Sequence, residues 1–486
     1  MNTKYGSIVG LLALVLAVAI LASKVHSARG DKASIEGRPE NVATGVKDQE
    51  EVSVTVYNSN LGLVKDVRNP TLANGLTELK FGEVAAQIMP YTVHIKSLSD
   101  PSRLQVFEQN YEYDLLTPQK LLEKFVGKEI SILKDGVEVP ITVLSTNQGL
   151  VYQLGGRIFS GHPGNLIFPT IPDNLIAHPT LVWLVQNRLS GRQKIEASYL
   201  MRGMTWKADY IAVLDSKDKS MDLNGWVTLD NQSGASYQNA RLKLVAGDVN
   251  RVLDEHRSRD VVAKLQAMSA ETAAAAPFTE QSFFEYHLYS LQRPTTIKNQ
   301  QTKQVTLLSA DNVPVNKRYF YYGAQQYFRQ RHGIPISNQK IGVYVNIANT
   351  KENRLGMPLP KGTIRVYKAD SDGSLQFIGE DRIDHTSRDE SVKIKMGDAF
   401  DILGERKQTD WRKIADNLYE VAFEISLRNH KEEPVIVSVI EPMLRDWEIL
   451  HSSHAYKKIE AHTAQFDIPV AKDRETKLHY KVRFKF

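Results

Sequence analysis

An alternation of apolar and polar side chains recurs through this sequence and limits its fold more than any other property of the chain. In the first clear run, Val52, Val54 and Val56 are separated by polar residues. Such a two-residue period places one face of a β-strand in a core and the other in water. Further runs occupy 341–347, 392–396, 421–427 and 478–486. The pattern predicts a mainly β protein with several antiparallel β-sandwich-like domains.

Turn and helix signals fill the spaces between these runs. Thr117 can cap a short helix that has Pro118 in its first position and ends at Gly127. The stretch 260–276 has helical propensity but little amphipathicity, so we interpret it as a low-complexity insertion exposed between strands. Residue pairs that tolerate positive φ angles separate strand-like segments at Asn74-Gly75, Asp135-Gly136 and Asp372-Gly373.

The length of 486 residues suggests about three domains of roughly 150 residues each. We expect the order to be a signal peptide (1–27), a flexible linker (28–50), an N-terminal β domain (51–200), a middle β region (201–340) with the insertion near 253–280, and a C-terminal β-sandwich (341–486).

The first residues have the pattern of an export signal. Lys4 precedes an unbroken apolar run at 8–22, and small or apolar residues before Ala28 suit cleavage by a signal peptidase. The alternative is an uncleaved membrane anchor, although the run is shorter than the ~20 residues that span a bilayer comfortably. No other long apolar segment follows, so we expect an exported protein, periplasmic or secreted, with no further transmembrane segment.

Composition excludes several classes of function. The chain has no Cys, which rules out disulfides, thiolate metal sites and a Cys nucleophile. Its formal charge of +5 and the lack of a basic block argue against nucleic-acid binding. Common nucleophile, zinc and phosphate-loop motifs are missing. Two S-x-x-K matches, at 131–134 and 216–219, lack a helical context, and we interpret them as chance; no cofactor is expected.

An aromatic cluster is the first candidate binding site. It comprises Tyr319, Phe320, Tyr321, Tyr322 and Tyr327. Exposed rings of this kind form stacking platforms for sugars or patches for a protein partner. We favour the alternative that the segment packs its rings into a groove between domains, because aromatic residues in a β protein are usually core.

Two histidines are a weaker candidate. His451 and His454 lie three residues apart and offer imidazoles to a metal ion. An i,i+3 pair converges only on a helix, and the segment around them is not clearly helical. We therefore favour exposed loop histidines and expect no metal site.

Several long stretches carry a resemblance to a bacterial family. They include 199–214, 224–252, 283–308, 352–386 and 397–402, and the stretch 52–68 fits the same exported subgroup. The chain resembles domain-of-unknown-function proteins related to the mucoidy inhibitor A group. The resemblance implies an exported, β-rich protein without established catalytic residues, and the group's name hints at envelope polysaccharide. In the stretch 225–229, we interpret Trp226 as a core residue.

These observations favour an exported, non-enzymatic β-sandwich protein of the cell envelope that binds a protein or glycan partner. One alternative is a hydrolase with an unrecognised site in a cleft between domains, which predicts convergent titratable groups in a pocket. The other is a self-assembling surface or adhesin-like component.

Overall fold

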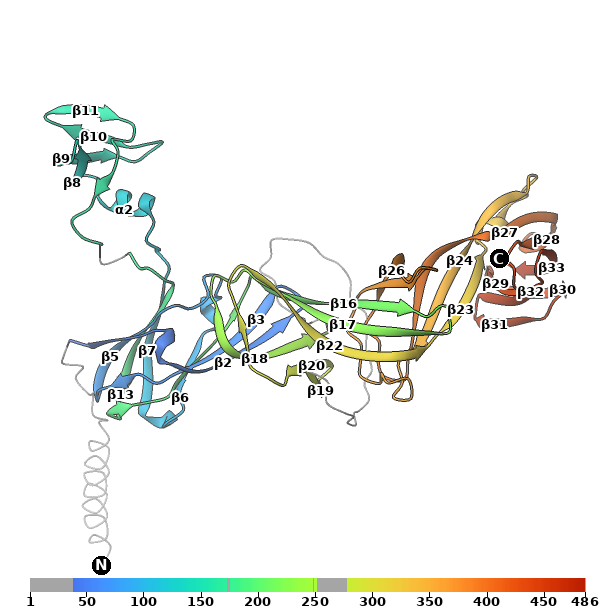
Figure 1. Ribbon diagram of the computed structural model, residues 1–486, viewed down its shortest axis with the longest axis horizontal. Helices are drawn as coiled ribbons and strands as arrows, with labels where there is room; N and C mark the ends of the chain where they lie inside the picture. Colours follow the sequence, from blue (N-terminus) through green and yellow to red (C-terminus); the bar gives the residue numbers. More distant parts are fainter. Residues whose placement is uncertain (1–37, 173–174, 248, 251–277, 486) are drawn as a thin grey trace, which may run out of the picture.

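The chain folds into a series of β-sheets arranged along one long axis (Figure 1). The computed structural model describes residues 38–172, 175–247, 249–250 and 278–485. The expected signal peptide and nearly all of the low-complexity insertion lie outside these residues. The predicted fold class is confirmed, because the described chain is mainly strand with few helices. Among the described residues, no helix is long and apolar enough to cross a membrane.

Two sheets and a short ribbon form the N-terminal part, and they share one large core with the middle of the chain. The first sheet contains β1 (Glu40–Thr44), β5 (Gly75–Phe81), β13 (Thr180–Asn187) and β7 (Leu104–Glu112), in that order. The second contains β19 (Phe278–Phe283), β20 (Tyr286–Leu291), β18 (Tyr237–Ala246), β2 (Gln49–Tyr57), β3 (Leu61–Arg68), β15 (Ile195–Met201) and β6 (His94–Ser97), with β21 (Thr295–Ile297) beside β18. The ribbon pairs β4 (Thr71–Leu72) with β14 (Gly191–Arg192).

Part of the segment expected to be a flexible linker is ordered. Residues 40–44 form β1, which pairs in parallel with β5. The fully buried guanidinium of Arg68 donates to the carbonyl oxygen of Thr44 at 2.8 Å, and it also pairs with Asp66. A buried cation of this kind needs every available acceptor, so it holds the end of β1 on the body. The N-terminal part also contains three single-turn 3-10 helices, at Val46–Asp48, Pro90–Thr92 and Pro101–Arg103.

A small separate unit, which we call the projecting module, comprises residues 118–168. Figure 1 shows it standing away from the long axis. It is inserted between the neighbouring strands β7 and β13 and has its own core around Phe125, Ile141 and Val143. The predicted helix is confirmed as its first element, with the Thr117 side chain capping it. Its elements are α2 (Pro118–Lys124), β8 (Glu129–Lys134), β9 (Val137–Ser145), β10 (Val151–Leu154), β11 (Arg157–Ser160) and β12 (Leu166–Ile167).

The middle sheet draws its strands from distant parts of the sequence. Its order is β22 (Gln301–Pro314), β17 (Ser220–Asn231), β16 (Met204–Leu214), β25 (Gly362–Ala369) and β26 (Leu375–Ile383). Strands from both sides of residue 340 therefore share one sheet, and the division into three β regions stays a prediction. The β16–β25 pair is parallel, and parallel pairs also occur in the two N-terminal sheets and the C-terminal sheet.

The core placement of Trp226 is wrong. On β17, Val227 and Leu229 are fully buried, whereas Trp226 is half-buried on the opposite face. Alternation fixes which residues share a face, but side-chain size does not decide which face meets the core. On the neighbouring strand β16, Trp206 is the tryptophan that enters the core, because it pairs with Leu229.

The C-terminal sheet has nine strands around a second core. Their order is β30 (Asp446–Ser452), β33 (Arg474–Lys485), β28 (Leu418–Asn429), β27 (Ser391–Ala415), β24 (Ile336–Ala348), β23 (Asn316–Tyr322), β29 (Val435–Pro442), β32 (Thr463–Val470) and β31 (Tyr456–Glu460). The predicted alternation is confirmed on β28 and β33, where every second residue from 421 to 427 and from 478 to 484 is buried. A second helix, α3 (Gln326–Arg329), was not expected from the sequence.

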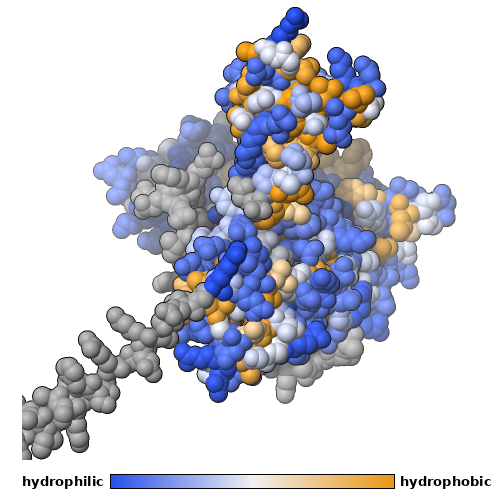
Figure 2. All heavy atoms as spheres, turned by 90° about the vertical axis from the view of Figure 1, so that its left-hand side faces the viewer, coloured by the Kyte–Doolittle hydropathy of each residue, from blue (hydrophilic) through white to orange (hydrophobic). Residues whose placement is uncertain are grey.

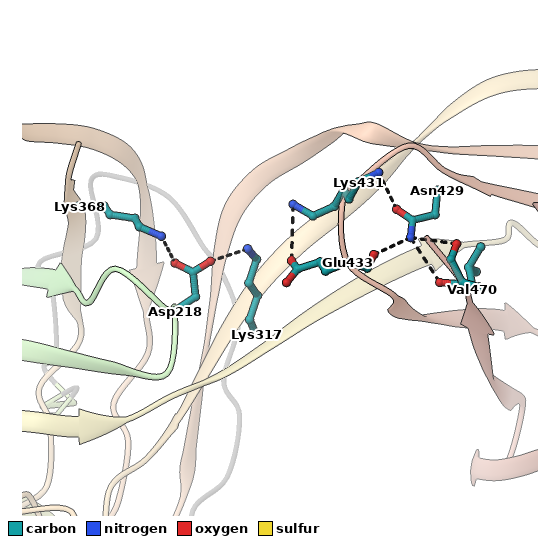
Figure 3. A network of polar contacts seen from close by, with 8 residues as sticks. Asp218, Lys317, Lys368, Asn429, Lys431, Glu433 and Val470 are labelled. Carbon is teal, nitrogen blue, oxygen red and sulfur yellow. Dashed lines mark hydrogen bonds and ion pairs between the residues drawn. The ribbon is translucent and has the colours of Figure 1, made fainter. Parts of the chain in front are cut away.

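An ion cluster lies where the middle and C-terminal sheets meet. Asp218, in the turn between β16 and β17, accepts from Lys317 of β23 at 2.7 Å and from Lys368 of β25 (Figure 3). A second network nearby has the Asn429 amide donating to the carbonyl oxygens of Glu433 and Val470. Burial raises the pKa of Asp218, but the two ammonium groups outweigh this effect and hold the pKa below its usual 3.8.

Replacing Asp218 with Asn is therefore expected to lower the free energy of unfolding by about 1 kcal/mol at pH 7. Because the pKa is lower in the folded state, the carboxylate stabilises the fold above pH 3.8 and loses this effect as the pH falls below it. Thermal unfolding of both proteins at pH 7 and pH 3 checks this. A difference that is as large at pH 3 as at pH 7 would contradict it.

Candidate functional site

The aromatic residues of the candidate ligand site divide between two faces of the C-terminal sheet. On β23, Tyr319 and Tyr321 face the core, with 7% and 0% of their surface exposed. Phe320 and Tyr322 face the other side, where Phe320 is 6% exposed and Tyr322 is 44% exposed. Packing therefore accounts for most of the cluster, and Tyr322 is the ring of β23 that remains accessible for stacking.

The outer face of this cluster is covered by a cation of the chain itself. The ammonium nitrogen of Lys393 lies 3.9 Å from the ring centre of Phe320 and 4.4 Å from that of Tyr344. It also donates to the Tyr322 hydroxyl at 3.0 Å. Burial against the rings lowers the pKa of Lys393. The Lys393 ammonium, held by cation–π attraction, covers the ring faces on which an incoming sugar or cation would stack. A ligand would therefore have to displace Lys393.

The inner face surrounds a buried ion pair. Arg406 of β27 and Glu441 of β29 are 1% and 0% exposed and form two hydrogen bonds to each other. The guanidinium also lies 5.2–5.5 Å from the ring centres of Tyr321, Tyr327 and Phe423. Burial alone would lower the pKa of Arg406, but the Glu441 carboxylate raises it above its usual value. Arg406 therefore stays charged.

A shallow pocket opens above this pair. It has a volume of about 170 Å³ including its mouth, and its lining includes Tyr327, His332, Arg406 and Gln408. Pockets for small-molecule substrates usually have about 300–1,000 Å³. Gln408 is fully used in holding the loop after α3, since its amide donates to the carbonyl oxygens of Tyr327 and Gln330. The pocket is therefore smaller than the usual site of a small-molecule substrate.

The two candidate metal ligands lie at the far edge of the sheet. His451 is on β30 and His454 follows it in an irregular segment, where its ring contacts the Ser453 hydroxyl at 2.9 Å. Among the described residues, no group of three or more His, Asp or Glu side chains is arranged to hold a metal ion. Both S-x-x-K matches lie outside helices, on β8 and in the β16–β17 turn.

The projecting module is the better candidate site, and none of its residues was among the candidates named from the sequence. Figure 2 shows apolar side chains gathered on its surface. Six of the large apolar side chains that the described chain exposes lie in the module, and three flank it: Val126, Leu133, Val137, Leu144, Ile158 and Phe159 in the module, with Tyr113, Leu116 and Ile171 beside it in the sequence. The sequence did contain a signal for this exposed surface. Ile158 and Phe159 are adjacent apolar residues in a segment bounded by glycines, whereas a strand with one buried face needs only every second residue to be apolar.

The sheet of the module has an unpaired edge strand at one side. β11 is at the edge of its sheet, paired with β10 on one side, and all four of its residues are exposed. Ile158 is 70% exposed, and Phe159 stacks on Tyr152 with ring centres 5.5 Å apart. At the base, Leu116 and Ile176 tie the two connecting segments together by backbone hydrogen bonds. An accessible edge with apolar neighbours is suited to pairing with another chain.

The part of the chain that matches a known family begins at β15. A family model described as a domain of unknown function, DUF4139, matches residues 195–486. The chain belongs to this family. The DUF4139 part includes the middle and C-terminal sheets, with the aromatic cluster and the Arg406–Glu441 pair, whereas the projecting module and residues 52–68 lie outside it. No curated protein matches the chain.

Proposed function

We propose that this chain is an exported, non-enzymatic protein of the cell envelope that holds a partner protein through its projecting module. The observation that carries the proposal is the open edge of β11 with exposed apolar side chains beside it. Soluble proteins usually protect such edges with charges, proline or a covering segment. An edge left open on a unit that stands away from the body favours a partner over internal packing.

Export rests on a different observation. The apolar run at 8–22 after Lys4 has the length of a signal segment, and the absence of Cys is compatible with any compartment. We also propose that the protein is related to the mucoidy inhibitor A group within this family, on the stretches named above. The family assignment itself carries no activity, so the partner has to be sought from the surface chemistry of the module.

A crosslinking experiment tests the partner. A photoreactive residue at position 158 of the purified chain, irradiated in an envelope extract, is expected to capture one protein. That protein, purified, is expected to bind Ile158→Ser at least about tenfold more weakly than the unchanged chain, since one buried isoleucine contributes about 1.5–3 kcal/mol. Ile436→Ser is the matched control, because Ile436 is 60% exposed on β29 of the C-terminal sheet. Equal losses in both variants would contradict the proposal.

The alternative functions predict other results. A hydrolase would turn over a panel of peptides or glycans and lose this activity in one point variant. A glycan-binding protein would bind on a glycan array through Tyr322, with Tyr322→Ala abolishing the signal. A self-assembling component would show a concentration-dependent increase in size with no partner present. Any of these results, with Ile158→Ser behaving as the unchanged chain, would overturn the protein-partner proposal.

A further inference from the structure

The hairpin formed by β19 and β20 ends in two exposed phenylalanines. Phe283 closes β19 and is 57% exposed, and Phe284 follows in the two-residue turn and is 79% exposed. The same strand begins with Phe278, which is 2% exposed in the large core. The hairpin is thus anchored at one end and exposes an apolar tip at the other. Figure 1 shows it on the opposite side of the long axis from the projecting module.

The backbone at this tip is unfavourable for a phenylalanine. Phe284 has a φ of +56°, in the left-handed region, where glycine or asparagine is accommodated more easily. An exposed ring in a strained position has two costs, the contact of its apolar surface with water and the backbone conformation. Neither is offset within the hairpin, where the nearest ring, that of Tyr286, lies 6.1 Å from Phe284 between ring centres. Such an outlier motivates a search for an external binding partner.

The shape and charge of the tip favour lipid over protein. A two-residue convex turn cannot supply the roughly 800 Å² that each partner contributes to a standard protein interface. Residues 278–291 contain no Lys or Arg, so the hairpin has no cation to recognise an acidic surface. Along the hairpin, the two phenyl rings are followed by Tyr286 and then by the Glu280–His287 pair, whose side chains are 2.7 Å apart. This order matches hydrocarbon, membrane interface and water.

We propose that Phe283 and Phe284 insert into the surface of a phospholipid bilayer and thereby orient the molecule. The insertion is shallow, because the charged Glu285 is adjacent to Phe284 in the turn. It depends on apolar burial and not on lipid charge. This inference goes beyond the proposed function and rests on separate residues, so failure of one leaves the other standing.

The absence of native Cys gives a sharp test. Phe284→Cys and Phe400→Cys are each labelled with an environment-sensitive fluorophore and mixed with vesicles of neutral phosphatidylcholine. Phe400, on β27, is 92% exposed and is the matched control. A blue shift is expected for the label at 284 and none for the label at 400. Shifts at both positions, or at neither, would overturn the proposal.

A second measurement uses unlabelled protein. Sedimentation with the same vesicles is expected to show at least about tenfold weaker binding for Phe283→Ser/Phe284→Ser than for the unchanged chain, because two large apolar side chains lose their burial. Phe400→Ser should bind as the unchanged chain does. Binding is also expected to be equal in low and high salt. Binding that requires anionic lipid and disappears in salt would contradict the proposal, as would a shift at position 284 that appears only after an envelope protein is added.

Discussion

Replacing Glu441 with Gln is expected to lower the free energy of unfolding by about 3–5 kcal/mol. The substitution keeps the shape of the side chain but leaves the Arg406 guanidinium, 1% exposed, without its counter-charge. A buried cation that loses its partner retains the full desolvation cost. The surrounding rings of Tyr321, Tyr327 and Phe423 do not replace a carboxylate. Urea denaturation followed by tryptophan fluorescence checks the expected loss.

Two controls separate charge from packing in this experiment. Glu432→Gln makes the same change in the exposed pair with Lys472, where the Glu432 side chain is 87% exposed, and should cost less than about 0.5 kcal/mol. The double variant Arg406→Met/Glu441→Leu removes both charges and is expected to unfold with a smaller loss than Glu441→Gln alone. A single variant as stable as the unchanged chain would show that water reaches Arg406.

Replacing Trp206 with Ala is expected to destabilise the protein by about 3–5 kcal/mol, as other large truncations in cores do. Its indole is 3% exposed, packs edge-to-face on Tyr289 at 6.3 Å and donates to the Val245 carbonyl oxygen at 3.2 Å. The same substitution at Trp226, on the adjacent strand but the opposite face, should cost no more than about 1 kcal/mol. Thermal unfolding of the two variants side by side checks the difference.

Comparing Trp206→Ala with Trp226→Ala shows which face of the middle sheet is buried in the core. If Trp226→Ala destabilised the protein as strongly as Trp206→Ala, the outer face of the middle sheet would be a second core. We expected Trp226 to be a core residue of the stretch 225–229. Its neighbours in alternation, Val227 and Leu229, are smaller but fully buried.

Local features of the fold followed well from the sequence. The strands at 421–427 and 478–484 are where alternation predicted them, the helix begins after Thr117, and the Asp135-Gly136 turn joins β8 to β9. These features depend on the sterics and hydrogen bonding of residues close in the chain. The candidate site was predicted less well. Residues 319–322 are all aromatic, so both faces of β23 carry apolar rings and the sequence does not show which face is buried.

That this protein is a succession of strands can be read from its residues alone, since side-chain period and turn residues act over a few positions of the chain. Long-range packing sets the parallel pairing of β16 with β25, the insertion of residues 118–168 as a unit between β7 and β13, and the meeting of Arg406 and Glu441 in a core. These contacts join residues far apart in the sequence. Their energies come from burial and from charge pairing in three dimensions, which no local pattern records.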